Sequence, residues 1–282
     1  MLALRITLGV LAALLLCFLI LLFLLAPGVN RRRRAILRGY REKGVNFAHR
    51  GLWGQPDGEA KIPAENSLSA FRAASAAGYG FELDTRLSKD RKVVVFHDDR
   101  LNRVAGVDRR VDELTAEELS ALSLSGTGEG VPLFADVLAA ANGAPILVEI
   151  KEDGFDHSVT DATAELLKNY PGPFIVESFD PFSLRRFRKL MPDVPTGLLV
   201  SHYTKDKKMR KPRYYLLQWM LFNFLCRPDF LAVDGRDADF LPIRLARIFR
   251  PVLYAWTVRS PEEEAALRKK GFDGVIFEKY RR

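Results

Sequence analysis

The chain has 282 residues, of which 48% are hydrophobic and 28% charged, and a formal net charge of +8. The basic charge is concentrated at the start, because residues 1–44 hold eight basic residues and one acid, which leaves +1 for residues 45–282. This balance argues against nucleic acid as a partner. The two cysteines, Cys17 and Cys226, lie far apart and imply no disulfide, which fits a reducing compartment.

The first predicted element is an uncharged apolar helix from Ile6 to Ala26. As an α-helix, these 21 residues span about 32 Å, enough to cross the hydrocarbon core of a bilayer. A cleavable signal peptide is the alternative, but the sequence Leu25-Ala26-Pro27-Gly28 is a poor cleavage site. We therefore expect residues 1–30 to form a retained transmembrane anchor.

A basic segment, residues 31–44, follows the apolar helix and is predicted to be a juxtamembrane linker. Only Arg5 precedes the helix, whereas seven basic residues follow it closely: Arg31, Arg32, Arg33, Arg34, Arg38, Arg41 and Lys43. Because positive charge stays on the cytoplasmic side, this asymmetry predicts a single-pass membrane protein whose C-terminal part lies in the cytoplasm. The arginines can also hold anionic lipid head groups of the bilayer.

Residues 45–282 alternate between strand and helix patterns and are long enough for one large domain. The eight predicted strands are Val45–His49, Tyr79–Asp84, Pro145–Ile150, Phe174–Ser178, Thr196–Val200, Phe230–Asp234, Val252–Thr257 and Gly274–Phe277. The predicted helices are Ser67–Ala77, Phe134–Ala141, Ser158–Asn169, Pro181–Leu190, Tyr214–Leu225, Leu241–Phe249 and Pro261–Lys270. A ninth strand, Val93–His97, belongs to an insertion that runs to about Pro132. This alternation predicts an α/β fold, a (β/α)8 TIM barrel.

Polar side chains gather where the predicted barrel strands end, which is where such barrels build their sites. Glu82 and Asp84 share one face of the second strand, and Glu149 lies at the end of the third. Three neighbouring acids repel one another, so a hard divalent cation such as Mg²⁺ or Ca²⁺ would relieve the repulsion. Zinc is less favoured, because no cluster of Cys and His residues has the usual spacing.

Cations and imidazoles accompany these acids. Arg50 and Lys151 suit the non-bridging oxygens of a phosphate diester. His49 and His97 can supply a general base and a general acid near neutral pH. The set indicates metal-assisted phosphoryl or acyl chemistry.

Five ordered motifs in this chain resemble the glycerophosphodiester phosphodiesterase family. They are His49-Arg50-Gly51, Pro63-Ala64-Glu65-Asn66, Glu82-Leu83-Asp84, His97-Asp98 and Glu149-Ile150-Lys151. Three later stretches are also similar: Glu177-Ser178-Phe179, Ala255-Trp256-Thr257-Val258 and Gly271-Phe272-Asp273-Gly274-Val275-Ile276. The similarity covers essentially all of residues 45–282, and five motifs in order are a specific signal.

The resemblance implies a barrel that hydrolyses glycerophosphodiesters to glycerol 3-phosphate and an alcohol with a divalent cation. It implies that one histidine deprotonates the glycerol hydroxyl next to the phosphate, the other protonates the departing alcohol, and water opens the resulting cyclic phosphate. The roles carried over are metal binding for Glu82, Asp84 and Glu149, acid–base catalysis for His49 and His97, phosphate binding for Arg50 and Lys151, and a place in or beside the metal ligands for Glu65.

Two positions are less clear from the resemblance. The family's last strand often ends in a Thr-Asp pair, whereas this chain has Glu278, which we expect to stand in for that acid. Trp256 is predicted to form a wall against the alcohol, with plain packing at the barrel rim as the alternative.

A basic and aromatic segment, residues 205–226, is a candidate for docking on the bilayer. Its basic residues precede the very apolar stretch Tyr214–Cys226, which leaves almost no polar face. The hypothesis is that this segment guides a lipid into the barrel mouth, and burial as an ordinary barrel helix is the alternative.

Two other functions remain open at this point. The same residues could hydrolyse a lysophospholipid or phospholipid as a phospholipase of the D or C type. A catalytically silent, membrane-bound barrel that binds lipid or phosphate is the other alternative, although the presence of all the acids and both histidines argues against it. The sequence does not predict an oligomeric state.

Overall fold

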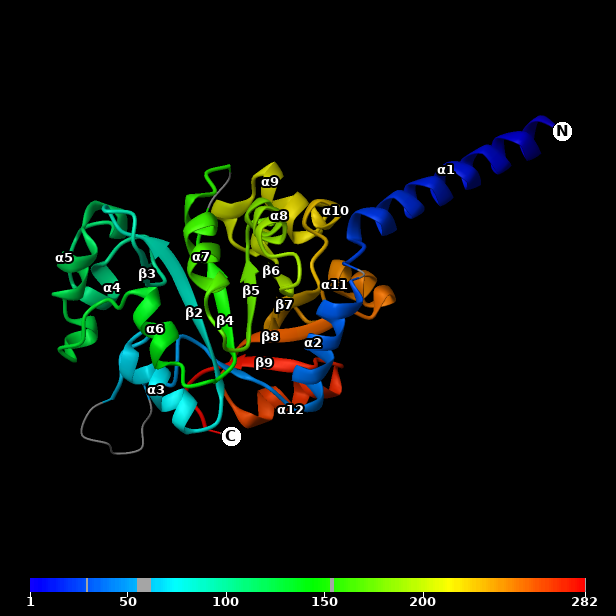
Figure 1. Ribbon diagram of the computed structural model, residues 1–282. Helices are drawn as coiled ribbons and strands as arrows, with labels where there is room; N and C mark the ends of the chain where they lie inside the picture. The colour runs from blue at the N-terminus through cyan, green and yellow to red at the C-terminus, as the bar shows by residue number, and fades with distance from the viewer. Residues whose placement is uncertain (29, 55–61, 153–154, 282) are drawn as a thin grey trace.

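The computed structural model describes residues 1–28, 30–54, 62–152 and 155–281. Within these residues, eight parallel strands close into a barrel, because β1 (Phe47–Ala48) pairs with both β2 (Gly80–Leu87) and β9 (Gly274–Phe277) (Figure 1). The other barrel strands are β4 (Ile146–Ile150), β5 (Phe174–Ser178), β6 (Thr196–Val200), β7 (Phe230–Asp234) and β8 (Val252–Val258). The predicted (β/α)8 barrel is confirmed.

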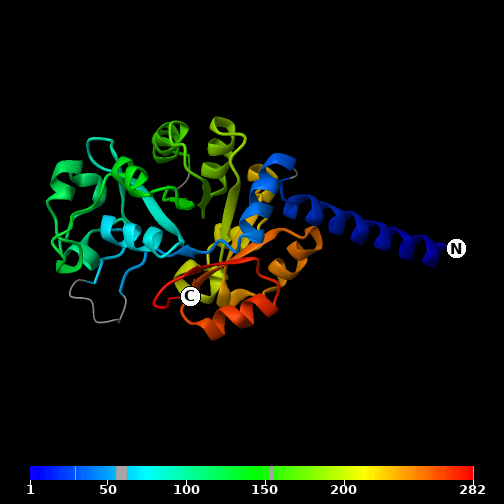
Figure 2. The same cartoon turned by 60° about the horizontal axis from the view of Figure 1, so that its bottom comes forward.

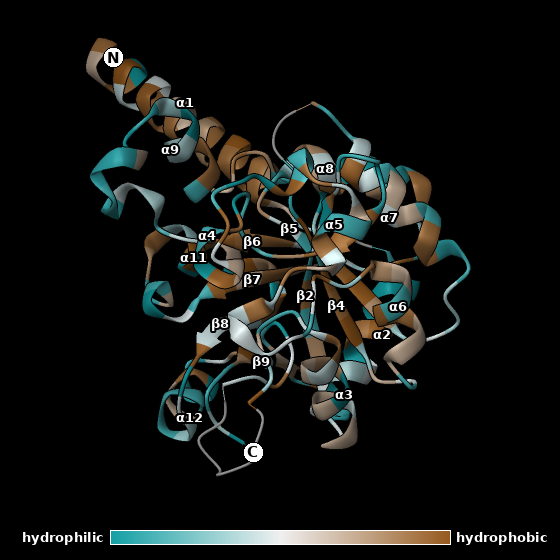
Figure 3. Cartoon of the chain, turned by 90° about the vertical axis from the view of Figure 1, so that its left-hand side faces the viewer, coloured by the Kyte–Doolittle hydropathy of each residue, from teal (hydrophilic) through white to brown (hydrophobic). Residues whose placement is uncertain are grey.

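Helices surround the apolar strands, as the view in Figure 3 shows. They are α3 (Leu68–Ala76), α6 (Phe134–Ala140), α7 (Ser158–Lys168), α8 (Pro181–Leu190), α9 (Pro212–Gln218), α10 (Asn223–Cys226), α11 (Leu241–Ala246) and α12 (Pro261–Lys269). Short 3₁₀ turns include η3 (Tyr203–Lys205), η4 (Lys207–Met209), η5 (Gly235–Asp237) and η6 (Arg247–Phe249). The single predicted helix Tyr214–Leu225 is wrong, because the backbone turns at Met220, where φ is +54°, and separates α9 from α10.

The predicted insertion forms a small lobe beside the barrel mouth (Figure 1). Its first strand, β3 (Val93–Val95), pairs antiparallel to β2 and so extends the sheet rather than the barrel. The remaining pieces are η1 (Val111–Glu113), η2 (Leu124–Gly126), α4 (Asn102–Ala105) and α5 (Ala116–Ser120). Apolar side chains of this lobe, among them Phe96, Leu101 and Leu119, form a buried cluster of their own.

Helix α1 (Leu2–Leu25) projects away from the barrel in both Figure 1 and Figure 2. It is long and apolar enough to cross a membrane, with only 6% of its 18-residue window buried, although a signal sequence shares these features. Its last turn contacts α10: the rings of Phe23 and Phe224 are 6.3 Å apart, and Asn223 donates a hydrogen bond to the Leu25 carbonyl. Arg227 stacks its guanidinium on the Phe23 ring.

The segment predicted as a basic linker is mostly helix α2 (Arg31–Glu42), which Asn30 caps by accepting a hydrogen bond from the Arg33 N–H. Its buried residues Leu37 and Tyr40 pack against Phe47 of the barrel interior. α2 therefore closes the N-terminal end of the barrel. The segment predicted as a linker is thus a helix packed on the barrel, because the arginine run hid its apolar side, and the domain boundary placed at Val45 stays a prediction.

Candidate functional site

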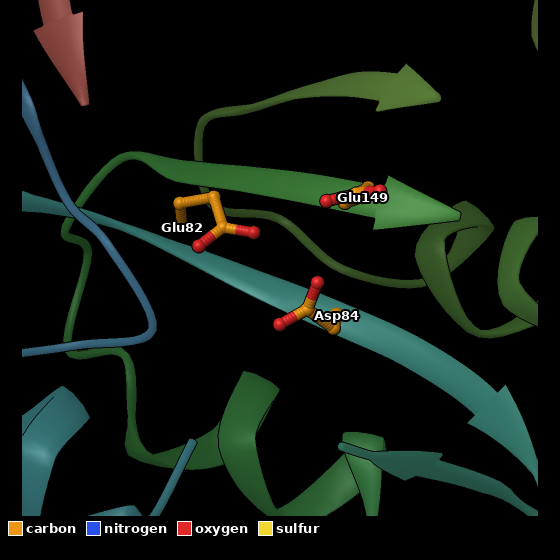
Figure 4. Close-up of side chains that lie close together, drawn as sticks. All are labelled: Glu82, Asp84 and Glu149. Carbon is orange, nitrogen blue, oxygen red and sulfur yellow. The ribbon is translucent and has the colours of Figure 1, made fainter. Parts of the chain in front are cut away.

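Three buried carboxylates meet inside the barrel on two neighbouring strands: Glu149 lies near the C-terminal end of β4, and Glu82 and Asp84 lie farther back on β2, which continues to Leu87 (Figure 4). Glu82 and Asp84 alternate along β2 and so face the same side, and Asp84 lies directly opposite Glu149 in the register of β2 and β4. One oxygen from each of the three residues lies within 4.8 Å of the others. The structure therefore brings together the three acids that the sequence predicts as metal ligands.

The cluster has oxygens left over for a ligand. Arg50 N–H donates to Glu82 Oε2 at 2.8 Å, and Asn66 Nδ2 donates to Asp84 Oδ2 at 2.8 Å. Glu82 Oε1 is buried and accepts no hydrogen bond among the described residues, whereas the buried Asp84 Oδ1 and Glu149 Oε1 face the Lys151 ammonium. Three carboxylates buried this close together are costly unless positive charge compensates them, and their oxygens are ligands that suit Mg²⁺ or Ca²⁺.

The three carboxylates and Lys151 change one another's pKa values. Burial and the neighbouring carboxylates raise the pKa of Glu82 well above its usual value, and burial raises the pKa of Glu149 to about 7. Burial alone would raise the pKa of Asp84, but nearby cations, first among them Lys151, hold it well below its usual value. The Lys151 ammonium lies 2.6 Å from Glu149 Oε1 and 3.1 Å from Asp84 Oδ1.

Each predicted catalytic histidine has one ring nitrogen held by a carboxylate. His49 Nδ1 lies 2.9 Å from Glu278 Oε2, and His97 Nδ1 lies 2.6 Å from Asp98 Oδ1. Burial lowers the pKa of His49, and burial also lowers the pKa of His97, to about 4. In each neutral ring Nδ1 donates to the carboxylate, which leaves Nε2 as the proton acceptor.

Glu65 does not join the carboxylate cluster. Its carboxylate accepts from Arg50 Nη1 at 2.8 Å and from both terminal nitrogens of Arg103 at 2.7 and 2.6 Å. Arg103 of the insertion also donates through Nε to Asp98. Glu65 thus positions Arg50 and, through Arg103, the carboxylate that holds His97.

A pocket of about 300 Å³ opens beside the cluster. Its lining includes most of the residues that the sequence predicts for the site: His49, Arg50, Glu82, His97, Glu149, Lys151 and Trp256. Trp256 donates from its indole N–H to the Ala232 carbonyl and meets Phe179 edge to face at 5.6 Å. Its ring is therefore both packed at the rim and part of the pocket wall.

Several residues of this site have no role predicted from the sequence. Glu177 is fully buried opposite Glu149 in the register of β4 and β5, and burial raises its pKa well above its usual value. Arg259 lines the pocket and donates to Glu278 at 2.7 Å. The matching positions of Glu149 and Glu177 at two strand ends were a signal that could have identified Glu177, whereas the pairing of Arg103 with Glu65 required the folded insertion.

Comparisons with known proteins found a family profile, curated relatives and solved structures that are similar to this chain. The sequence profile described as "Glycerophosphoryl diester phosphodiesterase family" matches residues 49–281. The chain is 28% identical over 253 residues to a glycerophosphodiester phosphodiesterase of Caldanaerobacter subterraneus, covering 83% of this chain and 93% of the relative. It is 31% identical over 138 residues to the rat lysophospholipase D GDPD1, covering 44% of this chain and 41% of the relative. A crystal structure of a glycerophosphodiester phosphodiesterase from Thermotoga maritima superposes with a TM-score of 0.62 at 29% identity, covering 83% and 93% of the two chains.

Proposed function

Because this chain belongs to the glycerophosphoryl diester phosphodiesterase family and is a phosphoric diester hydrolase, we propose that it cleaves glycerophosphodiesters to glycerol 3-phosphate and an alcohol. The observation that carries the proposal is the position of two carboxylate-bound histidines and three buried acids around one pocket. No other arrangement in the described residues combines an acid–base pair with a site for a cation.

Glu82, Asp84 and Glu149 would hold the divalent cation, Mg²⁺ or Ca²⁺. When bound, the cation neutralises negative charge that develops on the phosphate oxygens, which is worth several kcal/mol in related chemistry. Arg50 and Lys151 line the same pocket and would hold the non-bridging oxygens. Both cations are already oriented by carboxylates, Lys151 by Glu149 and Arg50 by Glu65.

The two histidines would move the protons. One neutral imidazole takes the proton of the glycerol hydroxyl next to the phosphate on Nε2, and the hydroxyl oxygen then bonds to phosphorus. The bond from phosphorus to the leaving alcohol breaks as the other histidine gives a proton to that oxygen. Because both rings are neutral in the free protein, that ring takes up its proton from solvent when the anionic phosphodiester binds beside it. Water then opens the cyclic phosphate and returns both rings to their starting states. Glu278 and Asp98 stabilise whichever ring is positively charged.

Helix α1 would hold this reaction at a membrane surface. Its length and apolar sequence fit a single span, and the arginines that follow it favour a cytoplasmic location for the barrel. The catalytic domain would then meet lipid-derived phosphodiesters at the inner face of the bilayer.

A second candidate substrate is a lysophospholipid. A row of aromatic rings leads from the pocket to α9: Trp256 to Phe179 at 5.6 Å, Phe179 to Tyr203 at 6.2 Å and Tyr203 to Tyr214 at 5.6 Å. On α9 the row ends beside Tyr215 and Leu216, which are 47% and 41% exposed. An acyl chain could lie along these rings while the phosphate sits at the cluster, and the rat relative is named as a lysophospholipase D.

The test is a substrate comparison with the full chain in a neutral detergent. Release of glycerol 3-phosphate from glycerophosphocholine, lost on chelation and restored by Mg²⁺ or Ca²⁺, is the expected result. His49→Ala and His97→Ala should abolish it, whereas His157→Ala, outside the pocket, should not. Unchanged turnover in His49→Ala contradicts the acid–base assignment.

Lysophosphatidylcholine is the second arm of the same test. If it is the better substrate, Tyr214→Ala should raise the KM for lysophosphatidylcholine and leave glycerophosphocholine unaffected. Leu241→Ala, which removes an exposed apolar side chain on α11 outside the row of rings, is the control. Equal effects of Tyr214→Ala on both substrates would argue against the acyl chain lying on this row.

A further inference from the structure

A second pocket, of about 330 Å³, lies where α1 meets α2. It is lined by Pro27 and Gly28 after α1, by Arg34, Arg38 and Arg41 of α2, and by Arg250 after η6. We call it the basic pocket. Asp229 and Pro251, which also line it, immediately precede β7 and β8, so the basic pocket is at the N-terminal end of the barrel. The carboxylate cluster is at the other end.

The positive charge of the basic pocket is not balanced from within. Asp229 is its acidic residue, and that carboxylate is already bound by Arg33 at 2.9 Å, with both side chains at most 5% exposed. Arg34 donates to the neutral Gly28 carbonyl at 3.1 Å. In the described part of the chain, Arg38 and Arg250 have no ion-pair partner.

One arginine of the basic pocket forms a long ion pair with an acidic residue outside the pocket. Arg41 lies 3.5 Å from Asp273, and the two side chains are 55% and 20% exposed. Solvent screens such a pair, so Arg41 keeps most of its capacity to bind an anion. The geometry therefore presents several guanidinium groups to one cavity.

The surroundings of the basic pocket suit the boundary between water and lipid. Pro27 follows α1 by two residues, and Figures 1 and 2 both place α2 and α11 at the base of α1. Two large apolar side chains of the adjoining segment are exposed, Leu241 at 50% and Ile248 at 58%. Apolar side chains beside unpaired arginines are typical of surfaces that insert into a head-group layer.

We propose that the basic pocket binds the head-group phosphate of an anionic phospholipid. Guanidinium groups match phosphate oxygens with paired hydrogen bonds, and a cavity of this size admits a phosphate with its glycerol while the acyl chains remain in the bilayer. The proposal rests on the membrane location proposed for α1. The bound lipid would fix how the barrel stands on the bilayer, through a site separate from the catalytic one.

The test measures lipid binding to the full chain in neutral detergent micelles by native mass spectrometry. Phosphatidylglycerol is the anionic probe and phosphatidylcholine the zwitterionic one. The pocket variant is Arg38→Gln with Arg250→Gln. The matched control is Arg31→Gln with Arg244→Gln, which removes the same charge from α2 and from α11 outside the pocket.

We expect phosphatidylglycerol to bind at least tenfold more tightly than phosphatidylcholine, and the pocket variant to lose at least tenfold of that affinity. The control should lose no more than about threefold, which general electrostatic attraction to the basic surface accounts for. Equal losses in the two variants, or no loss in the pocket variant, would overturn the proposal. Inorganic phosphate that competes at millimolar concentration would identify a site for soluble anions instead and overturn the lipid assignment.

Turnover of water-soluble glycerophosphocholine separates this proposal from the proposed function. Both double variants should keep the wild-type rate, because none of the four arginines is near the catalytic pocket. If lipid binding follows the expectation but no phosphodiester is hydrolysed, the proposed function fails while the lipid site stands. If phosphodiesters are hydrolysed but the lipid does not bind selectively, the lipid site fails while the proposed function stands.

Discussion

Glu278 Oε2 lies 2.9 Å from Nδ1 of His49, and the same carboxylate accepts a hydrogen bond from Arg259 through its other oxygen. Burial alone would raise the pKa of Glu278, but His49 and Arg259 lower it to about 2. At neutral pH Glu278 is therefore a carboxylate that orients the His49 ring and stabilises its charged form.

Replacing this carboxylate should affect catalysis more than folding. Glu278→Gln keeps the shape but removes the charge and allows the wrong ring tautomer, so we expect kcat for glycerophosphocholine to fall roughly 10- to 1,000-fold with a smaller change in KM. Steady-state kinetics across pH 5–9 check this. Glu262→Gln, on the exposed side of α12, is the control. A wild-type kcat in Glu278→Gln would mean that His49 needs no carboxylate partner.

The same pair makes a prediction about stability and pH. Because the folded pKa of Glu278 lies below the unfolded value of 4.5, its contribution to stability is fully present above pH 4.5 and is lost as the pH falls towards about 2. The lowered pKa of Glu278 corresponds to a contribution to the free energy of unfolding. Because solvent screens the interaction with the half-exposed Arg259, we expect this contribution to be about 2 kcal/mol. Urea unfolding of wild type and Glu278→Gln should show a difference that is constant from pH 5 to 7 and shrinks below pH 4. A difference that grows on acidification has the opposite sign and contradicts the assignment.

Removal of the cation should be visible without any substrate. The three buried acids repel one another when no cation is present, so Mg²⁺ or Ca²⁺ at 100 times its Kd should stabilise the fold by about 2.7 kcal/mol. Thermal unfolding with and without a chelator measures the shift. Asp84→Asn should lose it, and Glu165→Gln, an exposed substitution on α7, should keep it. An equal shift in Asp84→Asn would place the cation elsewhere.

The strands of the barrel were readily predicted from sequence because their burial is nearly continuous. β5, β6, β7 and β9 have the predicted bounds, since buried parallel strands appear as short apolar runs between turns. The same signal failed for α9 and α10, because an apolar run does not reveal a break at a residue such as Met220. A left-handed backbone at a methionine depends on the packing of the folded chain.

The site was predictable where its residues lie on strands and less so where loops supply them. Glu82, Asp84 and Glu149 are placed by strand alternation and register, which sequence spacing encodes. Arg103 reaches Glu65 from the insertion, 38 residues away in sequence. No local pattern reports such a pairing, because it arises only when the insertion packs beside the barrel mouth.

Helix α2 offers a matched pair of arginines one residue apart. Arg33 forms its ion pair with Asp229 inside the structure, where the two side chains are 5% and 0% exposed, whereas Arg32 pairs with Asp193 at 72% and 56% exposure. Removing one partner of a buried pair leaves an uncompensated charge, so Arg33→Ala should lower the free energy of unfolding by about 3–5 kcal/mol. Arg32→Ala should lower it by no more than about 1 kcal/mol, because solvent screens the exposed pair.

Urea unfolding of the full chain in detergent checks both values, and Asp229→Ala, alone and combined with Arg33→Ala, completes the double-mutant cycle. Removal of both partners should recover part of the loss, since no buried charge then remains unpaired. If Arg32→Ala and Arg33→Ala lower the free energy of unfolding by similar small amounts, α2 contributes little to the stability of the barrel. It would then act as the juxtamembrane linker that the sequence predicts. A loss confined to Arg33→Ala makes α2 part of the barrel.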